Sequence, residues 1–402
     1  MNMIIDIFNF SLTAILIGVS AAWIFLIRSM INSFRLTPYL DKFEKIKHNN
    51  PMVSIILPAR NEEEFLARCL DSLIDQDYPN YEVIVVDDSS EDSTGNIISE
   101  YSKHNSKITL VTAKPKPDGW MGKNWACMEG YRKATGELLL FTDADTTHAR
   151  NVISLAVSNL LSHNLDALTV IPKLVTIDFW TKITLPMIST FLHTRFSAIR
   201  VNDPSKKTGY FFGSFFIINQ KTYEAVGTHE GVKQEIIEDG ALGKKVKDSG
   251  YKMKMVRGDH LIKAIWARDK STLWNALKRL MIPLYLQGHG IAVGIFFAVL
   301  FLLFMPFPIL VYSSILTFET VSNSMLFVSS LIASILIYIG AVIEVKKGLQ
   351  IKLIYAAFGP LGSLVVVLGF LSGLLQAKKD SSVSWRGRTY SLKDHTQNSI
   401  RI

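Results

Sequence analysis

Acidic side chains follow hydrophobic runs at four places in this chain, and they are the residues whose type and spacing could do chemistry. The segments are Asn61-Glu62, Asp87-Asp88, Asp143-Ala144-Asp145 and, after a more extended stretch, Glu238-Asp239. A charged group at the end of a buried strand is costly unless something there uses it. In open α/β sheets the carboxyl ends of the strands form the edge where ligands bind. We therefore expect a ligand site built from these acids.

The Asp143-Ala144-Asp145 segment predicts a divalent cation. Carboxylates on alternate residues suit Mg²⁺ or Mn²⁺ holding a diphosphate. Such a cation neutralises the charge that develops when a nucleotide diphosphate leaves a sugar. We assign Asp145 as the direct metal ligand and Asp143 as a sugar or ribose contact. His148 is either a further ligand or a residue of the loop surface.

Polar residues after the first two hydrophobic runs could bind a nucleotide or cap helices. Asn61 and Glu62 offer hydrogen-bonding groups, but Asn61 could equally be a helix N-cap. Arg60 could meet a phosphate or lie on the surface. Asp87 and Asp88 suit neutral N–H and O–H donors, and two adjacent acids favour binding over capping alone.

Two further positions could approach the ligand. Lys123 follows a glycine-punctuated loop and begins a predicted helix, whose N-terminus favours anions. Gly213 lies in an aromatic run, where the absence of a side chain would allow a sugar or acceptor to come close. The phenylalanines around it could be core residues or acceptor contacts.

Alternating strands and helices must position these residues, and residues 52–258 have that pattern. Apolar runs predict strands at 53–57, 82–86, 108–112 and 137–142, and amphipathic segments predict helices at 63–75, 92–101, 124–134 and 151–162. Continuous Val, Ile and Leu runs are typical of a parallel sheet covered on both faces. Residues 211–218 predict another strand, packed against the sheet edge, and residues 238–250 predict a helix.

Four uncharged runs raise the hydrophobic content of the 402 residues to 49%. They cover residues 7–27, 280–318, 321–343 and 353–377, and each can span a hydrocarbon core, which needs about 20 apolar residues. The first run is followed by Arg28 and Arg35, which favours a retained anchor over a signal peptide. Positive charge on this side of the anchor also predicts that the domain after it is cytoplasmic.

The charge of the chain indicates which kind of partner it binds, and its cysteines indicate whether disulfides or a zinc site are expected. Basic residues flank the hydrophobic runs, for example at 346–347 and 378–379, so the net charge of +8 favours a membrane surface over nucleic acid. The two cysteines, Cys69 and Cys127, lie in predicted helices and suggest neither a disulfide framework nor a zinc site.

The ordered motifs resemble those of the family 2 glycosyltransferases, which are inverting enzymes of the GT-A fold. The likeness is closest to the membrane-bound subgroup that glycosylates lipids, similar to hopanoid-associated and carotenoid-acid glycosyltransferases. It covers residues 52 to about 274 and a tail signature, Trp385-Arg-Gly-Arg-x-Tyr390. The Gln-x-x-Arg-Trp motif of processive members is absent, which disfavours a polysaccharide synthase.

The resemblance implies an α/β, Rossmann-like GT-A domain with transmembrane helices, and it implies roles for particular residues. Asp239 is the catalytic base, and a single base suffices because no covalent intermediate forms. The expected substrate-binding residues are Pro58, Ala59, Arg60, Asn61, Glu62, Asp87, Asp88, Lys123, Asp143, Gly213 and Glu238. Those at 58–62 and 87–88 are expected to frame the base and ribose.

From residues and resemblance together we expect five parts. They are a transmembrane anchor (1–34), a cytoplasmic GT-A domain (50–262), an amphipathic interface helix (263–288), a membrane domain of about three segments (289–378) and a basic tail (379–402). The expected enzyme is a multi-pass protein of the cell membrane that transfers one sugar from a nucleotide-diphosphate sugar to a lipid. The alternatives are transfer to a polyprenyl phosphate, a processive synthase, or a scaffold with a degenerate domain.

The number of apolar runs and the charge of the tail predict different membrane topologies. Three full crossings after a cytoplasmic domain would put the tail outside, yet the tail carries Lys378, Lys379, Arg386 and Arg388. Residues 353–377 contain Gly359-Pro360 and are the candidate for a segment that enters and returns. A kinked crossing is the alternative.

Overall fold

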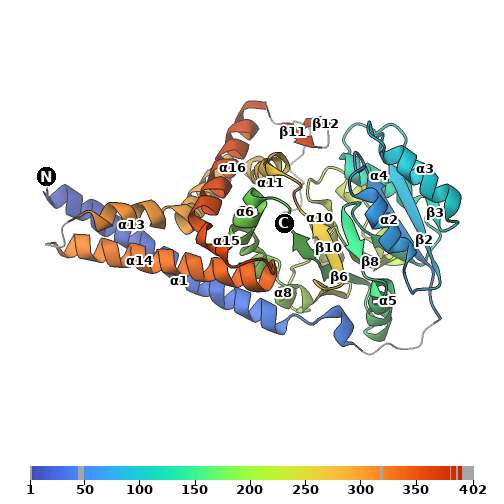
Figure 1. Cartoon of the computed structure of the whole chain (residues 1–402), viewed down its shortest axis with the longest axis horizontal. Helices are drawn as coiled ribbons and strands as arrows, with labels where there is room; N and C mark the ends of the chain where they lie inside the picture. Colours follow the sequence, from blue (N-terminus) through green and yellow to red (C-terminus); the bar gives the residue numbers. More distant parts are fainter. Residues whose placement is uncertain (1, 44–48, 317–319, 381, 386–387, 392–402) are drawn as a thin grey trace. The chain divides into compact units, whose positions relative to one another are not determined.

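The computed structural model describes residues 2–43, 49–316, 320–380, 382–385 and 388–391, and the chain divides into two compact units. We call the first the helical unit; it comprises Met1–Arg35, Thr176–Arg195 and Ala267–Val383. The second, the sheet unit, comprises Leu36–Val175, Phe196–Trp266 and Ser384–Ile402. Every predicted site residue belongs to the sheet unit, several of whose elements are labelled in Figure 1.

A seven-stranded sheet in the order β3-β2-β1-β4-β8-β6-β9 forms the centre of the sheet unit. Its strands are β1 (Val53–Ala59), β2 (Tyr81–Asp87), β3 (Ile108–Thr112), β4 (Leu138–Phe141), β6 (Ala167–Ile171), β8 (Phe216–Asn219) and β9 (Met253–Arg257). Strand β1 pairs in parallel with both β2 and β4, and β2 with β3. The carboxyl ends of these strands therefore lie at one edge, as predicted.

Strand β8 corrects two predictions. It runs antiparallel to both β4 and β6, so the sheet is mixed rather than parallel, and it lies between them rather than at an edge. Its Phe216, Ile217 and Ile218 are all buried, because both faces of the sheet are covered there. An apolar strand buried on both faces carries no sign of its direction, so the pattern could not reveal the reversal.

Helices cover both faces of the sheet. Residues Ile55 and Leu57 of β1 pack into one core with α2 (Leu66–Ile74), α3 (Thr94–His104) and α5 (Val152–Ser162). Ile56, which points to the opposite face, packs with α4 (Gly122–Tyr131), α8 (Ala198–Asn202) and α10 (Glu238–Asp248). A short helix, α9 (Gln220–Ala225), follows β8. The predicted elements are present with shifted ends. Helix α2 begins three residues late because residues 62–66 form a turn first.

Two smaller sheets complete this unit. One has the order β5-β10-β7, formed by β5 (Thr146–His148), β10 (Ile262–Ile265) and β7 (Lys173–Val175). The other pairs β11 (Ser382–Trp385) with β12 (Arg388–Ser391), which contain most of the tail signature. Arg386, Gly387 and residues 392–402 lie outside the described residues.

The helical unit contains the long apolar helices together with several shorter ones. They are α1 (Asn2–Leu36), α6 (Phe179–Ser189), α7 (Leu192–Arg195), α11 (Lys270–Gln287), α12 (His289–Val299), α13 (Pro306–Ser314), α14 (Val321–Ile343), α15 (Ile354–Ala357) and α16 (Gly359–Asp380). Among the described residues, Met3–Leu36, Val321–Gly348 and Gly359–Lys378 are long and apolar enough to cross a membrane. Helices α12 and α13 meet at a 53° bend and could together form a broken span or a re-entrant loop.

Helices α1 and α14 run side by side in the same direction. Near their starts, Asn9 Nδ2 donates to Asn323 Oδ1 at 2.9 Å, and further along the Trp23 ring packs directly against Gly340. The Trp23 indole also donates to the Leu302 carbonyl at 2.7 Å, next to the α12–α13 bend. Figure 1 shows α1, α13 and α14 as neighbouring rods within this unit.

Helices α11 and α16 pack closely against each other. Gly369 lies against the Leu277 side chain and Gly373 against the Lys278 backbone, where a β-carbon would come within 2.8 Å and 2.7 Å. Helix α11 covers most of the predicted interface helix (263–288), but the prediction began too early, because residues 262–265 form β10; α11 starts with a capping box made by Asp269 and Thr272. Its place in a membrane interface stays a prediction. The Gly359-Pro360 pair begins α16 instead of interrupting a helix.

Candidate active site

Lys123 stands at the centre of an acidic cluster in the sheet unit. Its Nζ lies 2.7 Å from Asp143 Oδ1 and 2.7 Å from Glu238 Oε1. The three residues come from the first turn of α4, the loop after β4 and the start of α10. Burial works against the charge on Lys123, but Asp143, Glu238 and Asp239 outweigh it and hold the lysine pKa above its usual value. The cluster therefore keeps a fixed cation among three acids.

Asp239 is held by backbone amides beside this cation. The N–H of Gly213 donates to Asp239 Oδ2 at 2.7 Å, and the N–H of Gly240 donates to Oδ1 at 2.7 Å. Burial, followed by the charge of Glu238, raises the pKa of Asp239 to about 7, although Lys123 acts in the opposite sense. A carboxylate with a pKa near neutrality is well suited to take a proton from a substrate.

Gly213 is needed because three functional groups surround it. A β-carbon there would lie 2.9 Å from Asp239 Oδ2, 3.0 Å from Lys123 Nζ and 3.3 Å from Asp143 Oδ2. The residue precedes β8 and lies in a turn, with Phe215 N donating to the Phe212 carbonyl at 3.0 Å. The sequence predicts that a sugar or acceptor comes close to Gly213. In this structure the groups that come close to it are the side chains of the acids and the lysine.

We expect Gly213→Ala to lower turnover by about 100-fold while leaving the fold intact. The added methyl group meets the ends of side chains, which can move, but a displacement of about 1 Å at reacting groups costs about 10²-fold. Turnover and the melting temperature should be measured together. Gly290→Ala in α12 is the matched control, because nothing lies within 4 Å of a β-carbon there. A variant that loses activity only because it unfolds would contradict the expectation.

The loops after β1 and β2 bind each other. Arg60 Nη1 donates to the Asp88 carbonyl at 2.7 Å, and Arg60 Nη2 pairs with Glu91 Oε1 at 2.9 Å. Asn61 accepts from Glu91 N at 2.9 Å, and Glu62 N donates to Thr94 Oγ1 at 2.8 Å. The N-cap reading of Asn61 is wrong, because α2 begins at Leu66 and Asn61 is bonded to the other loop. Pro58 and Ala59 are the last residues of β1.

Both loops contain a residue in the left-handed region of backbone space. Asn61 has φ 54° and Ser89 has φ 56°. Such conformations cost energy for residues other than glycine and are concentrated at ligand sites. Asp87, at the end of β2, accepts from Ser90 N at 3.0 Å and so helps to hold the second loop.

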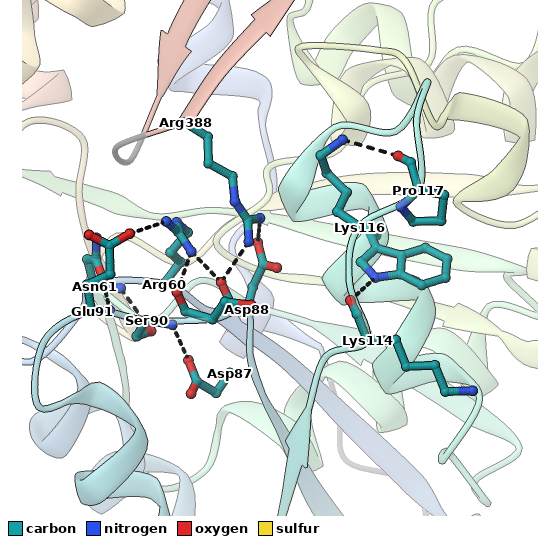
Figure 2. A network of polar contacts seen from close by, with 12 residues as sticks. Arg60, Asn61, Asp87, Asp88, Ser90, Glu91, Lys114, Lys116, Pro117 and Arg388 are labelled. Atoms are coloured by element: carbon teal, nitrogen blue, oxygen red, sulfur yellow. Dashed lines mark hydrogen bonds and ion pairs between the residues drawn. The ribbon is translucent and has the colours of Figure 1, made fainter.

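Asp88 is buried and contacts the carboxyl-terminal tail. Its Oδ2 pairs with Arg388 Nη1 of β12, and Arg388 Nη2 donates to the Asp88 carbonyl at 3.3 Å. Figure 2 shows Arg388 reaching down from the tail hairpin to Asp88, with Arg60 on one side and Lys114 and Lys116 on the other. Burial raises the pKa of Asp88, whereas Arg388 and Arg60 lower it. No sequence signal singled out Arg388 beyond its place in the tail signature.

Asp145, Asp143 and Glu62 act together on one buried thiol. After burial itself, the charges of these three acids are what raise the pKa of Cys69, whose Sγ lies 3.6 Å from the Asp143 carbonyl. The structure therefore brings the loop after β1 close to the Asp-X-Asp segment after β4. It also confirms that Cys69 and Cys127 lie in helices and form no disulfide.

The donor set fits a cation shared with a substrate. Within the described part of the chain, no group of three or more acidic, histidine or cysteine side chains could hold a metal by itself. Mg²⁺ is usually bound by one or two carboxylates together with substrate phosphates. Asp145 with a diphosphate would meet this requirement, whereas Asp143 is already paired with Lys123.

His148 is neither a surface residue nor placed as a ligand. It lies in β5 and is buried, with Nε2 at 3.0 Å from Thr142 Oγ1 and Nδ1 at 3.3 Å from Ser72 Oγ. Burial lowers its pKa to about 4, so the ring is neutral at pH 7. The loop-surface reading is corrected, because residues 146–148 continue as a strand.

The predicted site residues thus form two connected groups at one edge of the sheet. Lys123, Asp143, Gly213, Glu238 and Asp239 make the acidic cluster, and Arg60, Asn61, Asp87 and Asp88 make the paired loops. A residue that the sequence reasoning missed is Tyr210, whose ring packs against Gly240. Burial and the charges of Asp239 and Glu238 raise its pKa.

Comparisons with known proteins relate part of the chain to a family of glycosyl transferases. Residues 54–227 match the model of glycosyl transferase family 2. The chain is 30% identical over 205 residues to the 4,4'-diaponeurosporenoate glycosyltransferase of Staphylococcus aureus (strain USA300), covering 50% of this chain and 53% of that protein. The alignment thus spans about half the length of that relative.

A solved structure shares the fold. The chain is similar to a mannosyltransferase from Pyrobaculum calidifontis in complex with GDP-Man and Mn²⁺, with a TM-score of 0.52 and 17% identity. The match covers 92% of this chain and 99% of that one. At this identity the likeness concerns the fold alone.

Proposed function

We propose that residues 54–227, which match the model of glycosyl transferase family 2, form a glycosyltransferase domain of the GT-A fold, and that the protein transfers one sugar from a nucleotide-diphosphate sugar to a membrane lipid, with inversion. The observation that carries the proposal is the meeting of Asp143, Glu238 and Asp239 around Lys123, with the Asp239 pKa raised to about 7. Glu238 is buried and Asp143 and Asp239 are partly buried, and an acidic cluster of this kind is costly for a fold unless a substrate uses it.

The proposed reaction is a single in-line displacement. The acceptor oxygen forms a bond to the anomeric carbon while the bond from that carbon to the diphosphate breaks, and its electron pair leaves with the diphosphate. Asp239 takes the acceptor proton, because its pKa lies near neutrality and backbone amides fix both of its oxygens. Lys123 neutralises Asp143 and Glu238 and can meet the donor. A divalent cation, when bound, would neutralise the leaving diphosphate.

The remaining roles follow from position. Asp87 and Asp88 at the end of β2 would receive hydroxyl or N–H groups of the nucleoside, and Asp145 would hold the cation. Pro58, Ala59, Arg60, Asn61 and Glu62 would frame the base and ribose, with Arg60 and Asn61 acting through the loop that they fix. The lipid acceptor is proposed because the same chain carries helices long and apolar enough to cross a membrane.

A transfer assay tests the proposal directly. The purified full-length protein is incubated with a lipid extract, Mn²⁺ and a panel of radiolabelled nucleotide-diphosphate sugars, and label in the organic phase is counted. Mass spectrometry of lipids from cells with and without the protein identifies the product. An α-linked donor should give a β-linked glycolipid. Nucleotide-sugar hydrolysis without lipid labelling would contradict the acceptor class.

The fold also bears on membrane topology. The parallel packing of α1 and α14 supports crossings in the same direction, and we propose that the end of α14 lies on the same side of the membrane as the end of α1. Both ends carry positive charge, Arg35 on α1 and Lys346-Lys347 after α14, as expected for the cytoplasmic side. Helices α12 and α13 then form one broken crossing between α11 and α14. The pairing of Arg388 with Asp88 supports a position of β12 in the compartment of the sheet unit, and we therefore propose that α16 does not cross.

Cysteine labelling in intact cells tests this topology. Ile315→Cys, between α13 and α14, should react with an impermeant thiol reagent from outside. Gln350→Cys and Ser382→Cys should react only after permeabilisation. The wild-type protein is the background control, since Cys69 and Cys127 are buried. Labelling at position 382 from outside would indicate a crossing by α16, and labelling at 350 but not 315 would indicate a re-entrant α12–α13.

A further inference from the structure

We propose that Arg388 is a positioning residue of the donor site, which holds the Asp88 carboxylate so that its second oxygen can receive the nucleoside. The inference rests on the proposed function, and it adds the carboxyl-terminal hairpin to the residues that build the nucleotide pocket. Arg388 lies 300 residues beyond Asp88 in the sequence but in the same compact unit.

Arg388 contacts Asp88 at two points. Arg388 Nη1 pairs with Asp88 Oδ2, and Nη2 donates to the Asp88 main-chain carbonyl at 3.3 Å. The guanidinium therefore grips both the side chain and the backbone of one residue, which fixes the carboxylate orientation. The side chains of Arg388 and Asp88 are 21% and 5% exposed, so solvent screens this pair only partly.

The other oxygen of this carboxylate is left for a ligand. Asp88 Oδ1 is buried and has no hydrogen-bond partner among the described residues. A buried acceptor without a donor is costly, and native proteins rarely retain one without a use. The carboxylate follows β2 at the edge of the sheet where ligands bind, and its free oxygen can accept from a ribose hydroxyl or a base N–H.

Arg60 cannot replace Arg388 in this role. Its guanidinium is bonded to the Asp88 and Ser89 carbonyls and to the Glu91 carboxylate, whereas the ion pair with the Asp88 carboxylate is made by Arg388. Arg388 is therefore the cation that the structure places on this carboxylate. Together with Arg60 it counters the effect of burial on the Asp88 pKa and favours the ionised, accepting form.

Nucleotide binding to the full-length protein tests the inference. Dissociation constants of UDP and GDP are measured by calorimetry, and those of uridine and guanosine by competition. We expect Arg388→Ala to weaken the preferred diphosphate and its nucleoside to a similar degree, about 10- to 100-fold, as for loss of a hydrogen bond that involves charge. Arg388→Lys should restore part of the affinity. Lys103→Ala on α3, an exposed cation, is the charge-matched control and should bind as wild type.

A double-mutant cycle shows whether Arg388 acts through Asp88. In an Asp88→Asn background, Arg388→Ala should have little further effect. Additive losses would overturn the inference, and so would wild-type affinity in Arg388→Ala. Tighter binding would show that Arg388 blocks the site, and a loss confined to the diphosphate would show that it binds phosphate. A wild-type protein that binds no nucleotide diphosphate would instead overturn the proposed function.

Discussion

Asp239→Asn is expected to lower turnover of a hydroxyl acceptor by about 10²–10⁴-fold, with donor affinity close to that of the wild type. The asparagine keeps the size of the side chain but cannot take a proton. Donor affinity should change little because the lysine contacts are made by Asp143 and Glu238 rather than by Asp239. Turnover is measured by lipid labelling, and donor affinity by calorimetry.

The pH profile gives an independent readout of the same residue. The base must be ionised, so the wild-type turnover should rise with pH through about 7, the value to which burial raises the Asp239 pKa. The variant should lose this rise. Stability should show the opposite trend. A carboxyl group whose folded pKa is raised contributes stability below its unfolded pKa of about 3.9, and this contribution is lost as pH rises through the folded pKa. We therefore expect the melting temperature of the wild type to fall relative to that of Asp239→Asn as pH rises from 5 to 8; the asparagine also loses one of the two acceptors for the amides of Gly213 and Gly240, at both pH values.

Asp248→Asn is the matched control for this experiment. It makes the same chemical change on the same helix, at a half-exposed residue that pairs with Lys244. Near-normal turnover in Asp239→Asn would rule out the base role. It would shift the assignment to transfer onto a polyprenyl phosphate, where a phosphate oxygen attacks and a base is less necessary.

Much of the sheet unit could be predicted because its signals are local. Strands β1, β2 and β4 are short apolar runs followed by acids, and the rule that ligands bind at the carboxyl ends places Asp88, Asp143 and Asp145 at one edge. The Glu238-Asp239 pair was predicted to start a helix and to lie in the site, and the structure puts it there at the start of α10. The reversed direction of β8 has no local signal, because both of its faces are buried.

The contacts that the sequence could not supply are the long-range ones. Nothing near Lys123 indicates that it pairs with both Asp143 and Glu238, which lie 20 and 115 residues further along. Arg388 is a similar case, since its partner Asp88 lies 300 residues earlier. Asn61 looked like a helix cap because asparagine favours that position, but its hydrogen bonds to the second loop determine its conformation. In each case the partner of the side chain is set by tertiary packing, which the neighbouring sequence does not indicate.

Asp145→Asn is expected to abolish the metal dependence of donor binding while leaving the fold intact. We assign the cation to Asp145 because it belongs to the Asp-X-Asp segment, whose other acid, Asp143, shares its charge with Lys123. Loss of residues that merely support metal ligands costs about 10–100-fold in affinity, so loss of the ligand itself should cost at least about 100-fold. The measurement is donor affinity in Mn²⁺ and in a chelator. The variant in Mn²⁺ should match the wild type in chelator.

The chelator arm separates a metal ligand from a direct sugar contact. If Asp145 touched the sugar instead, the variant would also bind more weakly than the wild type without metal. Asp71→Asn on α2, where the carboxylate accepts from the Tyr101 hydroxyl at 2.7 Å, is a control for the same change at the surface. An unchanged metal-dependent affinity in Asp145→Asn would rule out Asp145 as the metal ligand. The charge of Asp145 also raises the pKa of the buried Cys69 thiol, so this pKa should be slightly lower in Asp145→Asn. Such a decrease would show that the removed charge lies near Cys69 on α2.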